Sequence, residues 1–220
     1  MKTLDEIGLD YRTDKSSPYH NYLNTYEKYF KEFRDEPAIS VWELGIGDIN
    51  SSNREGESAL VWRDYFTCSP TIRVFDNDPV KVARFTLAKD KIWSHCMDQT
   101  DKKGFESLVK EVGRPFIIID DASHIQINTL TSFEALFPLL QSGGLYCIED
   151  TVAPAYWESW GGQETIFDSM FMKYFSVLTH FINLEKKENF PNPPTIKIQD
   201  WVKEIESIHF YRSQIIIKKK

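Results

Sequence analysis

The sequence predicts an α/β domain in which a doubly wound, mostly parallel sheet of seven strands is covered by helices on both faces. Three observations lead to this prediction: short apolar runs alternate with longer amphipathic segments, the runs are apolar at almost every position, and a hairpin pattern follows them. Strict alternation of strand and helix is typical of a parallel sheet, and near-continuous apolarity is typical of strands buried on both faces. In such sheets, ligands bind at the carboxyl ends of the strands.

The strands are predicted from short runs that are rich in Ile, Val and aromatic residues and that have Gly, Pro or Asp at their ends. The runs that we expect to be parallel are residues 39–44, 71–75, 92–96, 116–119 and 145–148. Residues 207–218 are expected to form an antiparallel hairpin that turns near Arg212 and Ser213. The hairpin completes the set of seven strands.

Helices are predicted where apolar residues recur at intervals of three and four positions. The predicted ranges are about 57–66, 80–89, 102–112 and 128–140 between the strands, 21–33 before the sheet and 165–184 after the last parallel strand. Residues 151–162 form a connection too long and too aromatic for a plain loop, and we expect it to be a lid or a wall of the site. We interpret residues 1–220 as a single domain, with residues 1–36 as a helical cap over the site.

Composition and charge argue against several classes of protein. The chain has 220 residues, of which 41% are hydrophobic and 27% charged, and its formal net charge of -7 disfavours nucleic acid and anionic membranes as partners. No apolar run approaches the roughly 18 to 20 residues that cross a bilayer, and the first residues lack the pattern of a signal peptide, so we expect a cytoplasmic protein. The 3 cysteines, far apart in the sequence, argue against a disulfide framework or a thiolate metal site.

A glycine turn after the first predicted strand indicates a nucleoside site. Gly45 and Gly47 allow the backbone to approach a ligand closely, and Glu43 is an acidic residue inside the same motif. Asp76, at the end of the second strand, is placed to accept both hydroxyls of a ribose. Because Asn50 stands where a dinucleotide site would have its third glycine, adenosine without a diphosphate fits better than NAD.

Acidic residues follow both the fourth and the fifth predicted strands. Asp120 and Asp121 close the fourth strand, and Glu149 and Asp150 close the fifth. If these strands are neighbours, their ends lie about 5 Å apart, and the converging carboxylates would repel one another unless a cation lay between them. Oxygen ligands select a hard ion such as Mg²⁺, Mn²⁺ or Ca²⁺. We predict Asp121, Glu149 and Asp150 as metal ligands, while Asp120 could cap the next helix.

His124 follows Asp121 by three residues and is interpreted as a general base. An alcohol is too weak an acid to lose its proton unaided at neutral pH, so a metal that polarises the oxygen and a histidine that takes the proton complement each other. The alternative is that His124 caps the following helix or is simply exposed. His20 could also face the site, whereas the remaining histidines are expected to serve packing.

Together these motifs resemble the class I S-adenosylmethionine-dependent methyltransferases, whose fold is Rossmann-like. Within that group they resemble the metal-dependent sugar O-methyltransferases that modify macrolide deoxysugars. The matching segments are residues 12–15, 43–47, 56–62, 76–79, 120–124 and 136–150, followed by Tyr156 and Trp157. They span nearly the whole chain in the order that the family shows. The chain departs from the family pattern at Asp48 and Ala122, where glycine is usual, and in the polar insert 48–55.

The resemblance implies S-adenosylmethionine as cofactor, Mg²⁺ or Mn²⁺ as metal, and a sugar hydroxyl on a small molecule or glycan as acceptor. It carries metal binding to Asp121, Glu149 and Asp150, and the role of general base to His124. The expected cofactor residues are Glu43, Gly45, Gly47, Asp76, Asp98, Gln99, Asp120, Thr13, Lys15 and Ser58. The expected acceptor contacts are Tyr156, Trp157, Trp160 and His20. The alternative that the three aromatic residues close the core stays open.

The role of Asp98 and the class of reaction each allow more than one interpretation. Asp98 could reach the exocyclic amine of the adenine or cap the following helix. A catechol-type O-methyltransferase would share the metal and the cofactor, and His124 argues against it. An NAD-linked oxidoreductase is disfavoured by Asn50 and by the wide gap from Gly47 to Asp76. A non-catalytic adenosine-binding subunit would bind the cofactor without turnover, and the sequence does not decide between a monomer and a homo-oligomer.

Overall fold

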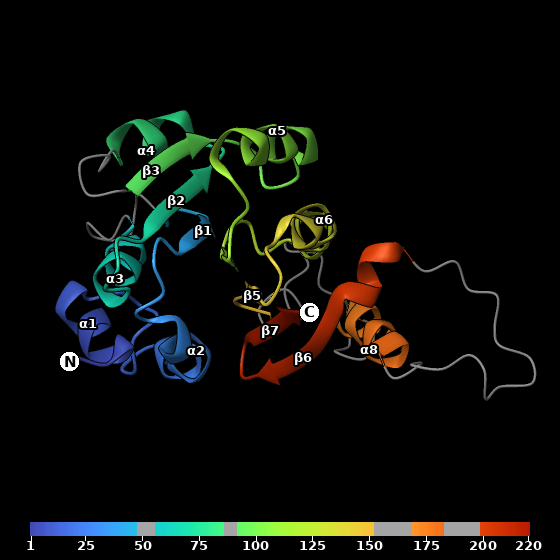
Figure 1. The fold of residues 1–220 in the computed structure, drawn as a ribbon, viewed down its shortest axis with the longest axis horizontal. Coiled ribbons are helices and arrows are strands. Elements are labelled where there is room, and N and C mark those ends of the chain that lie inside the picture. The colour runs from blue at the N-terminus through green and yellow to red at the C-terminus, as the bar shows by residue number, and fades with distance from the viewer. Residues whose placement is uncertain (48–55, 86–91, 152–168, 183–198) are drawn as a thin grey trace, which may run out of the picture.

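Figure 1 shows the computed structural model, which describes residues 1–47, 56–85, 92–151, 169–182 and 199–220. Within these residues, seven strands form one sheet in the order β3-β2-β1-β4-β5-β7-β6. The strands are β1 Ser40–Leu44, β2 Thr71–Asp76, β3 Ile92–Cys96, β4 Ile117–Asp120, β5 Leu145–Ile148, β6 Ile205–Tyr211 and β7 Gln214–Lys219. The first five are parallel, and β7 pairs antiparallel with β5 and β6. The predicted fold class is confirmed, including the hairpin that turns at Arg212 and Ser213.

Helices cover both faces of this sheet (Figure 1). They are α1 Leu4–Tyr11, α2 Tyr22–Phe30, α3 Glu57–Tyr65, α4 Pro79–Arg84, α5 Lys102–Val112, α6 Gln126–Leu136 and α8 Met170–Ile182. Short 3₁₀ helices are η1 Lys31–Phe33, η3 Phe137–Leu139 and η7 Asp200–Glu204. Residues of α1 to α4 pack on one face, and residues of α5, α6 and α8 pack on the other. Right-handed crossovers explain this division, because the strand order reverses between the β1–β3 half and the β4–β5 half.

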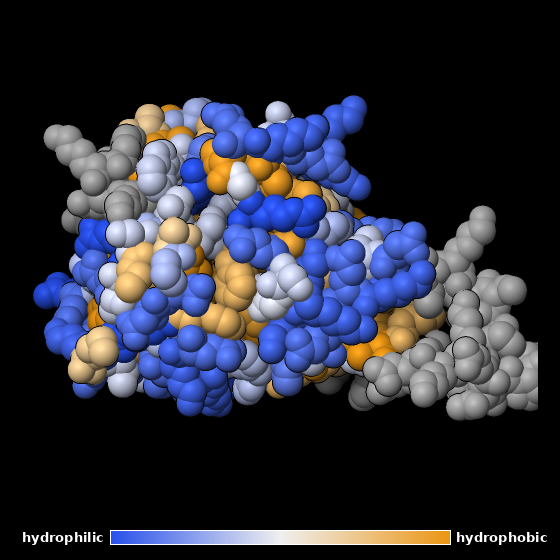
Figure 2. All heavy atoms as spheres, in the orientation of Figure 1, coloured by the Kyte–Doolittle hydropathy of each residue, from blue (hydrophilic) through white to orange (hydrophobic). Residues whose placement is uncertain are grey.

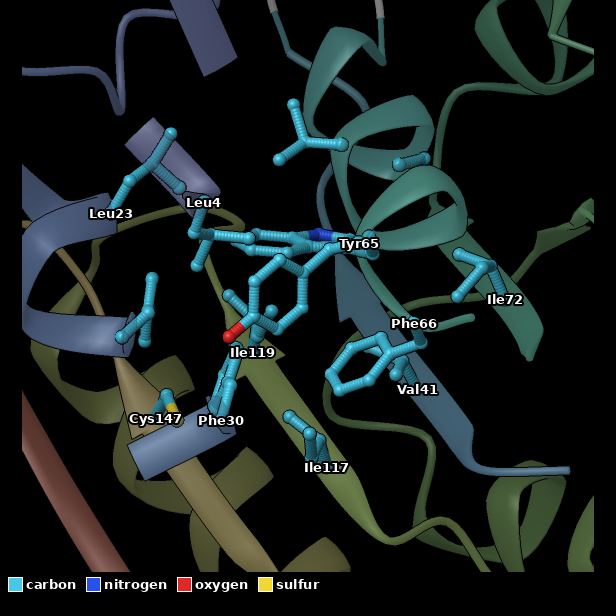
Figure 3. Packing of buried hydrophobic residues seen from close by; sticks show 14 of the residues in the cluster. Leu4, Leu23, Phe30, Val41, Tyr65, Phe66, Ile72, Ile117, Ile119 and Cys147 are labelled. Carbon is cyan, nitrogen blue, oxygen red and sulfur yellow. The ribbon is translucent and has the colours of Figure 1, made fainter. Parts of the chain in front are cut away.

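Two hydrophobic cores follow from the alternation of side chains along the strands. Val41 and Ile117 lie in the first core, which Figure 3 shows around Tyr65. Their neighbours in sequence, Trp42 and Ile118, lie in the second core. The central strands are therefore buried on both faces, as their near-continuous apolar runs predicted.

The strand register brings the predicted site residues to one edge of the sheet. Leu44 of β1 is opposite Asp120 of β4, and Asp120 is opposite Ile148 of β5. Backbone hydrogen bonds continue this alignment beyond the strands, since the amide of Asp121 donates to Leu44 and the amide of Glu149 donates to Asp120, both at 3.0 Å. The acidic residues that directly follow β4 and β5 therefore lie side by side at the same edge of the sheet.

The N-terminal region contains a helix that the sequence patterns did not predict. α1 begins with a capping box in which Thr3 and Glu6 exchange hydrogen bonds. Only Leu4, Ile7 and Gly8 of its 8 residues are buried, which is too little for a recognisable apolar period. The predicted helix 21–33 divides into α2 and η1, and the predicted helix 128–140 corresponds to α6 and η3. Residues 86–89, 152–162, 165–168 and 183–184 of the predicted segments lie outside the described residues.

One face of the molecule is mostly hydrophilic among the described residues. Figure 2 shows hydrophilic residues over most of the visible face, with smaller hydrophobic patches between them. Tyr19, Met172 and Val177 are among the larger hydrophobic side chains that are exposed. None of the described helices combines the length and the apolar content of a membrane span.

Candidate functional site

A cavity of 440 Å³ opens at the carboxyl ends of the parallel strands. This is the place where ligands bind in sheets of this topology. One part of its wall comes from the turn after β1 and the ends of β2 and β3, and the other comes from the segments after β4 and β5. The predicted residues in its lining are Gly45, Gly47, Asp76, Asp98, Gln99, Asp121, His124 and Asp150.

The glycine turn brings the ends of three strands into contact. Gly45 and Gly47 have φ angles of 99° and 94°, a conformation that side-chain-bearing residues rarely adopt. The amide of Gly45 donates to the carbonyl of Phe75 at 2.7 Å. A Cβ atom on Gly45 would lie 2.1 Å from the carbonyl oxygen of Asp121. The sequence needs glycine at this position because β1 and β4 leave no room for a side chain.

Asp76 presents a carboxylate to the cavity at the end of β2. One oxygen accepts from the amide of Ile46 at 3.2 Å, and the other accepts from the amide of Asp78 at 2.9 Å. The ammonium of Lys81 lies 3.6 Å from the first oxygen. A carboxylate has about four lone-pair sites, so Asp76 keeps acceptor capacity for ribose hydroxyls while its backbone partners fix its direction.

Asp98 and Gln99 extend the wall beyond β3. Asp98 accepts from the amide and the hydroxyl of Thr100, and these hydrogen bonds lower its pKa below the usual range. The cap of α5 is Asp101, whose side chain accepts from an amide of the first turn, so Asp98 is not the cap of that helix. Gln99 accepts from the amide of Ser123 at 3.1 Å and thereby ties this wall to the segment after β4.

A second cavity of 110 Å³ adjoins the first and shares Asp14, Gly45, Gly47 and Asp121 with it. The other predicted residues that line it are Thr13, Lys15 and Ser58. These residues come from the connection between α1 and α2 and from the start of α3. The N-terminal segment therefore forms part of the site wall.

Glu43 is buried and is not among the residues that line either cavity. One of its carboxylate oxygens accepts from the indole nitrogen of Trp62 at 3.0 Å. Burial raises the pKa of Glu43 to about 7, against the influence of the Lys15 ammonium 3.9 Å away. Glu43 supports the site from beneath rather than forming its wall.

Asp121, His124 and Asp150 form a compact cluster on the other side of the cavity. One donor atom from each lies within 4.8 Å of the others. The Nε2 atom of His124 is 3.6 Å from Oδ2 of Asp150 and 4.0 Å from Oδ1 of Asp121. The strand ends predicted to converge do converge, and they place an imidazole between two carboxylates.

The backbone at two of these residues has an uncommon conformation. His124 and Asp150 have φ angles of 56° and 53°, in the left-handed region. Residues with a Cβ occupy this region at a cost of roughly 1–2 kcal/mol, and such conformations cluster at functional sites. The turns after β4 and β5 thus direct His124 and Asp150 toward the cavity by a backbone geometry that local preference alone would not select.

Glu149 is engaged by the N-terminal segment. Its Oε2 atom accepts from the ammonium of Lys15 at 2.5 Å, and its Oε1 atom accepts from the hydroxyl of Tyr26 at 2.6 Å. Lys15 also donates to Asp121. Burial by itself would lower the pKa of Lys15, but the attraction of Asp121, Glu149 and Glu43 outweighs it and holds that pKa above the usual range. One buried ammonium therefore links the carboxylates of β1, β4 and β5.

Other predicted residues lie away from the cavity walls. Asp120 is buried and accepts from the hydroxyl of Tyr146 at 2.9 Å, and burial raises its pKa to about 7. His20 is exposed and stacks on Tyr22, with ring centroids 5.1 Å apart. The predicted acceptor contacts Tyr156, Trp157 and Trp160 lie outside the described residues.

The site includes two tyrosines that the sequence interpretation missed. The hydroxyl of Tyr22 donates to Asp150, and that of Tyr26 donates to Glu149. Residues four apart share one face of a helix, so the pair could have been read as two hydroxyls directed to one place. The apolar pattern of this helix pointed instead to core packing.

Comparisons with known proteins find O-methyltransferases that are similar to this chain. The chain is 35% identical over 160 residues to the L-olivosyl-oleandolide 3-O-methyltransferase of Streptomyces antibioticus, a match that covers 72% of this chain and 39% of that protein. It is 29% identical over 220 residues to the 8-demethyl-8-alpha-L-rhamnosyl tetracenomycin-C 2'-O-methyltransferase of Streptomyces olivaceus, covering 99% of this chain and 54% of that protein. No protein-family profile matches the chain.

A solved structure extends the likeness to the fold. The MycE methyltransferase from the mycinamycin biosynthetic pathway, in complex with Mg and SAH, matches with a TM-score of 0.86 and 27% identity, covering 99% of this chain and 54% of that one. The chain has the class I methyltransferase fold. The resemblance stated from the motifs is confirmed. The chain spans about half or less of the length of the relatives it matches.

The residues of this methyltransferase-fold domain fit both Mg and SAH, the two groups in the MycE complex. The carboxylates of Asp121 and Asp150, with donor atoms within 4.8 Å of each other and of His124, offer the oxygen ligands that a hard divalent ion prefers. Asp76 beside the glycine turn suits the ribose of an adenosine. Both sets of residues line the same cavity.

Proposed function

We propose that this chain forms an S-adenosylmethionine-dependent and metal-dependent O-methyltransferase site that acts on a sugar hydroxyl of a glycosylated small molecule. The observation that carries the proposal is the single cavity that joins Asp76 and the glycine turn to Asp121, His124 and Asp150. The names of the relatives support a sugar acceptor, since they include an olivosyl and a rhamnosyl group.

The nucleoside end of the cavity would hold the cofactor. In this proposal Asp76 accepts the ribose hydroxyls, Asp98 lies toward the adenine, and Gln99 braces the wall between them and the acidic cluster. Thr13, Lys15 and Ser58 border the adjoining smaller cavity.

The acidic cluster would hold the metal. Asp121 and Asp150 are the ligands that the geometry supports directly, and Glu149 stands behind them, held by Lys15 and Tyr26. Bound there, Mg²⁺ or Mn²⁺ would supply the Lewis acidity that makes an acceptor hydroxyl easier to deprotonate.

His124 would accept the proton of the acceptor hydroxyl. Its Nε2 atom faces the carboxylates of Asp121 and Asp150, which would stabilise the imidazolium that results. In the overall step the acceptor oxygen bonds to the methyl carbon, the carbon–sulfur bond breaks with its electrons going to sulfur, and the proton goes to His124. Alignment of these atoms would supply much of the acceleration, because a sulfonium methyl is already reactive.

Residues 1–36 would act as a cap of this site within one domain. Two features support this role: α1 and α2 are packed into the first core, and the connection between them carries Lys15 to the acidic residues. The cap is thus built into the domain in this proposal.

Methyl transfer from S-adenosylmethionine tests the proposal directly. Deoxysugar glycosides and catechols serve as alternative acceptors, each with Mg²⁺ and with EDTA. We expect transfer to glycosides that EDTA abolishes. His124→Ala should lose about 100-fold to 10,000-fold in turnover while SAH still binds, as expected for removal of a general base.

Matched variants sharpen this test. His209→Ala removes an exposed histidine of the hairpin and should leave turnover unchanged. Asp121→Asn should weaken Mn²⁺ binding together with activity. Undiminished turnover in His124→Ala would overturn the base assignment, full activity in EDTA would overturn the metal, and transfer to catechols alone would overturn the sugar acceptor.

A further inference from the structure

The two carboxylates that face the cavity each divide their oxygens between two partners. In Asp121, Oδ2 accepts from the Lys15 ammonium and Oδ1 is directed toward Nε2 of His124. In Asp150, Oδ1 accepts from the Tyr22 hydroxyl and Oδ2 is directed toward the same nitrogen. Each aspartate therefore has one oxygen held by the N-terminal segment and one oxygen turned to the cluster.

Tyr22 is well anchored for this contact. Its side chain is buried at the first position of α2, and its ring stacks on His20 with an angle of 18° between the planes. The preceding turn is closed by backbone hydrogen bonds, among them those from Asn21 to Ser16 and from Leu23 to Lys15. The hydroxyl is consequently delivered to Asp150 by a fixed backbone rather than by a mobile side chain.

Asp150 needs such a restraint more than an ordinary aspartate does. Its φ angle of 53° lies in the left-handed region, and its side chain is about a quarter exposed, at 26%. A carboxylate at an open cavity edge can rotate about its side-chain torsions, and each rotation exchanges or removes the oxygen that faces His124. The Tyr22 hydroxyl holds one oxygen and so fixes the direction of the other.

We propose that Tyr22 is a positioning residue of the metal site, which fixes Oδ2 of Asp150 toward the cation position beside His124, as Lys15 fixes Oδ1 of Asp121. This inference rests on the proposed function, because it concerns the metal that the acidic cluster would hold. Tyr22 itself does not line the cavity and would touch neither cofactor nor acceptor.

Tyr22→Phe tests the proposal, since it removes one hydroxyl and retains the ring, the stacking and the charge. Mn²⁺ affinity is measured by electron paramagnetic resonance, and SAH affinity by calorimetry, on the full chain. We expect the Mn²⁺ dissociation constant to rise about tenfold, which is the lower end of the usual effect of removing a residue that orients a metal ligand. SAH affinity should stay within about twofold, and turnover should recover when Mn²⁺ is raised to saturation.

Tyr29→Phe is the matched control. Tyr29 lies on the same helix, but its hydroxyl is paired with that of Tyr211 at 2.8 Å and contacts no carboxylate of the cluster. This variant should bind Mn²⁺ like the unmodified chain. A purely structural role for Tyr22 would instead lower the melting temperature of Tyr22→Phe and leave its Mn²⁺ affinity unchanged, and that result would overturn the inference.

The two proposals fail in different ways. If the unmodified chain binds no Mn²⁺, the metal site and the inference about Tyr22 both fall. If it binds Mn²⁺ and Tyr22→Phe binds equally well, the positioning role falls while the proposed function stands.

Discussion

Gly45 is the point at which the turn after β1 touches the segment after β4. Replacement by alanine would place a Cβ atom 2.1 Å from the carbonyl oxygen of Asp121 and 3.2 Å from the Cα atom of Ala122. Both are backbone atoms, so no side chain can rotate out of the way. The two strand ends would have to separate.

The cost has two parts. Gly45 has a φ angle of 99°, and a residue with a Cβ pays about 1–2 kcal/mol in this region. Displacing tightly packed neighbours adds about 1–3 kcal/mol. We expect Gly45→Ala to lower the free energy of unfolding by about 3 kcal/mol, or the melting temperature by roughly 6–12 °C in a domain of this size.

Gly113→Ala separates the two parts. Gly113 has a φ angle of 87°, and nothing lies within 4 Å of the Cβ that alanine would add. Urea denaturation should therefore show a smaller loss for this variant than for Gly45→Ala, because only the backbone term of about 1–3 kcal/mol remains. Mn²⁺ and SAH affinities should both fall in Gly45→Ala and stay unchanged in Gly113→Ala. Equal destabilisation of the two variants would refute the close contact between β1 and β4.

Three further predictions concern single side chains. Burial lowers the pKa of His95, so folding favours its neutral form, and the free energy of unfolding decreases as the pH falls below about 6.5. His95→Phe can keep the stacking on Phe75, and urea denaturation should show that this variant loses less stability between pH 7.5 and 5 than the unmodified chain. Tyr146→Phe removes the hydroxyl that donates to Asp120 and should cost about 2 kcal/mol at pH 8, and less at pH 5.5, because the pKa of Asp120 is about 7 and its carboxyl is then protonated. Asp76→Ala should weaken SAH binding roughly thirtyfold, about 2 kcal/mol, and calorimetry that finds full affinity would remove Asp76 from the cofactor site.

The sheet and the acidic edge were predictable because both depend on patterns that are local in the sequence. Apolar runs marked β1 to β5, and acids placed just after β4 and β5 had to meet once those strands were neighbours. Asp121 and Asp150 thus came together as expected. The shape of this edge depends on the left-handed backbone at His124 and Asp150 and on the glycine turn after β1.

The role of Lys15 was not predictable in the same way. The motif resemblance places Lys15 with the cofactor, which stays a prediction, but it gave no sign that the ammonium is buried among Asp121, Glu149 and Glu43, partners far away in the sequence. A buried lysine is identified by the charges that surround it, and no local pattern reports those. The contact of Tyr22 was not predicted for a related reason, because its ring fits the apolar pattern of α2 while its hydroxyl donates to Asp150, which is far away in the sequence.

The left-handed turns at His124 and Asp150 have a consequence for protein engineering. Glycine or asparagine tolerates that backbone better than the residues present, so a library screened only for heat tolerance should accumulate those substitutions at positions 124 and 150. Under the proposed function, such variants would be more stable but inactive. Attempts to stabilise this domain should therefore keep residues 124 and 150 unchanged and select stabilising substitutions at other positions.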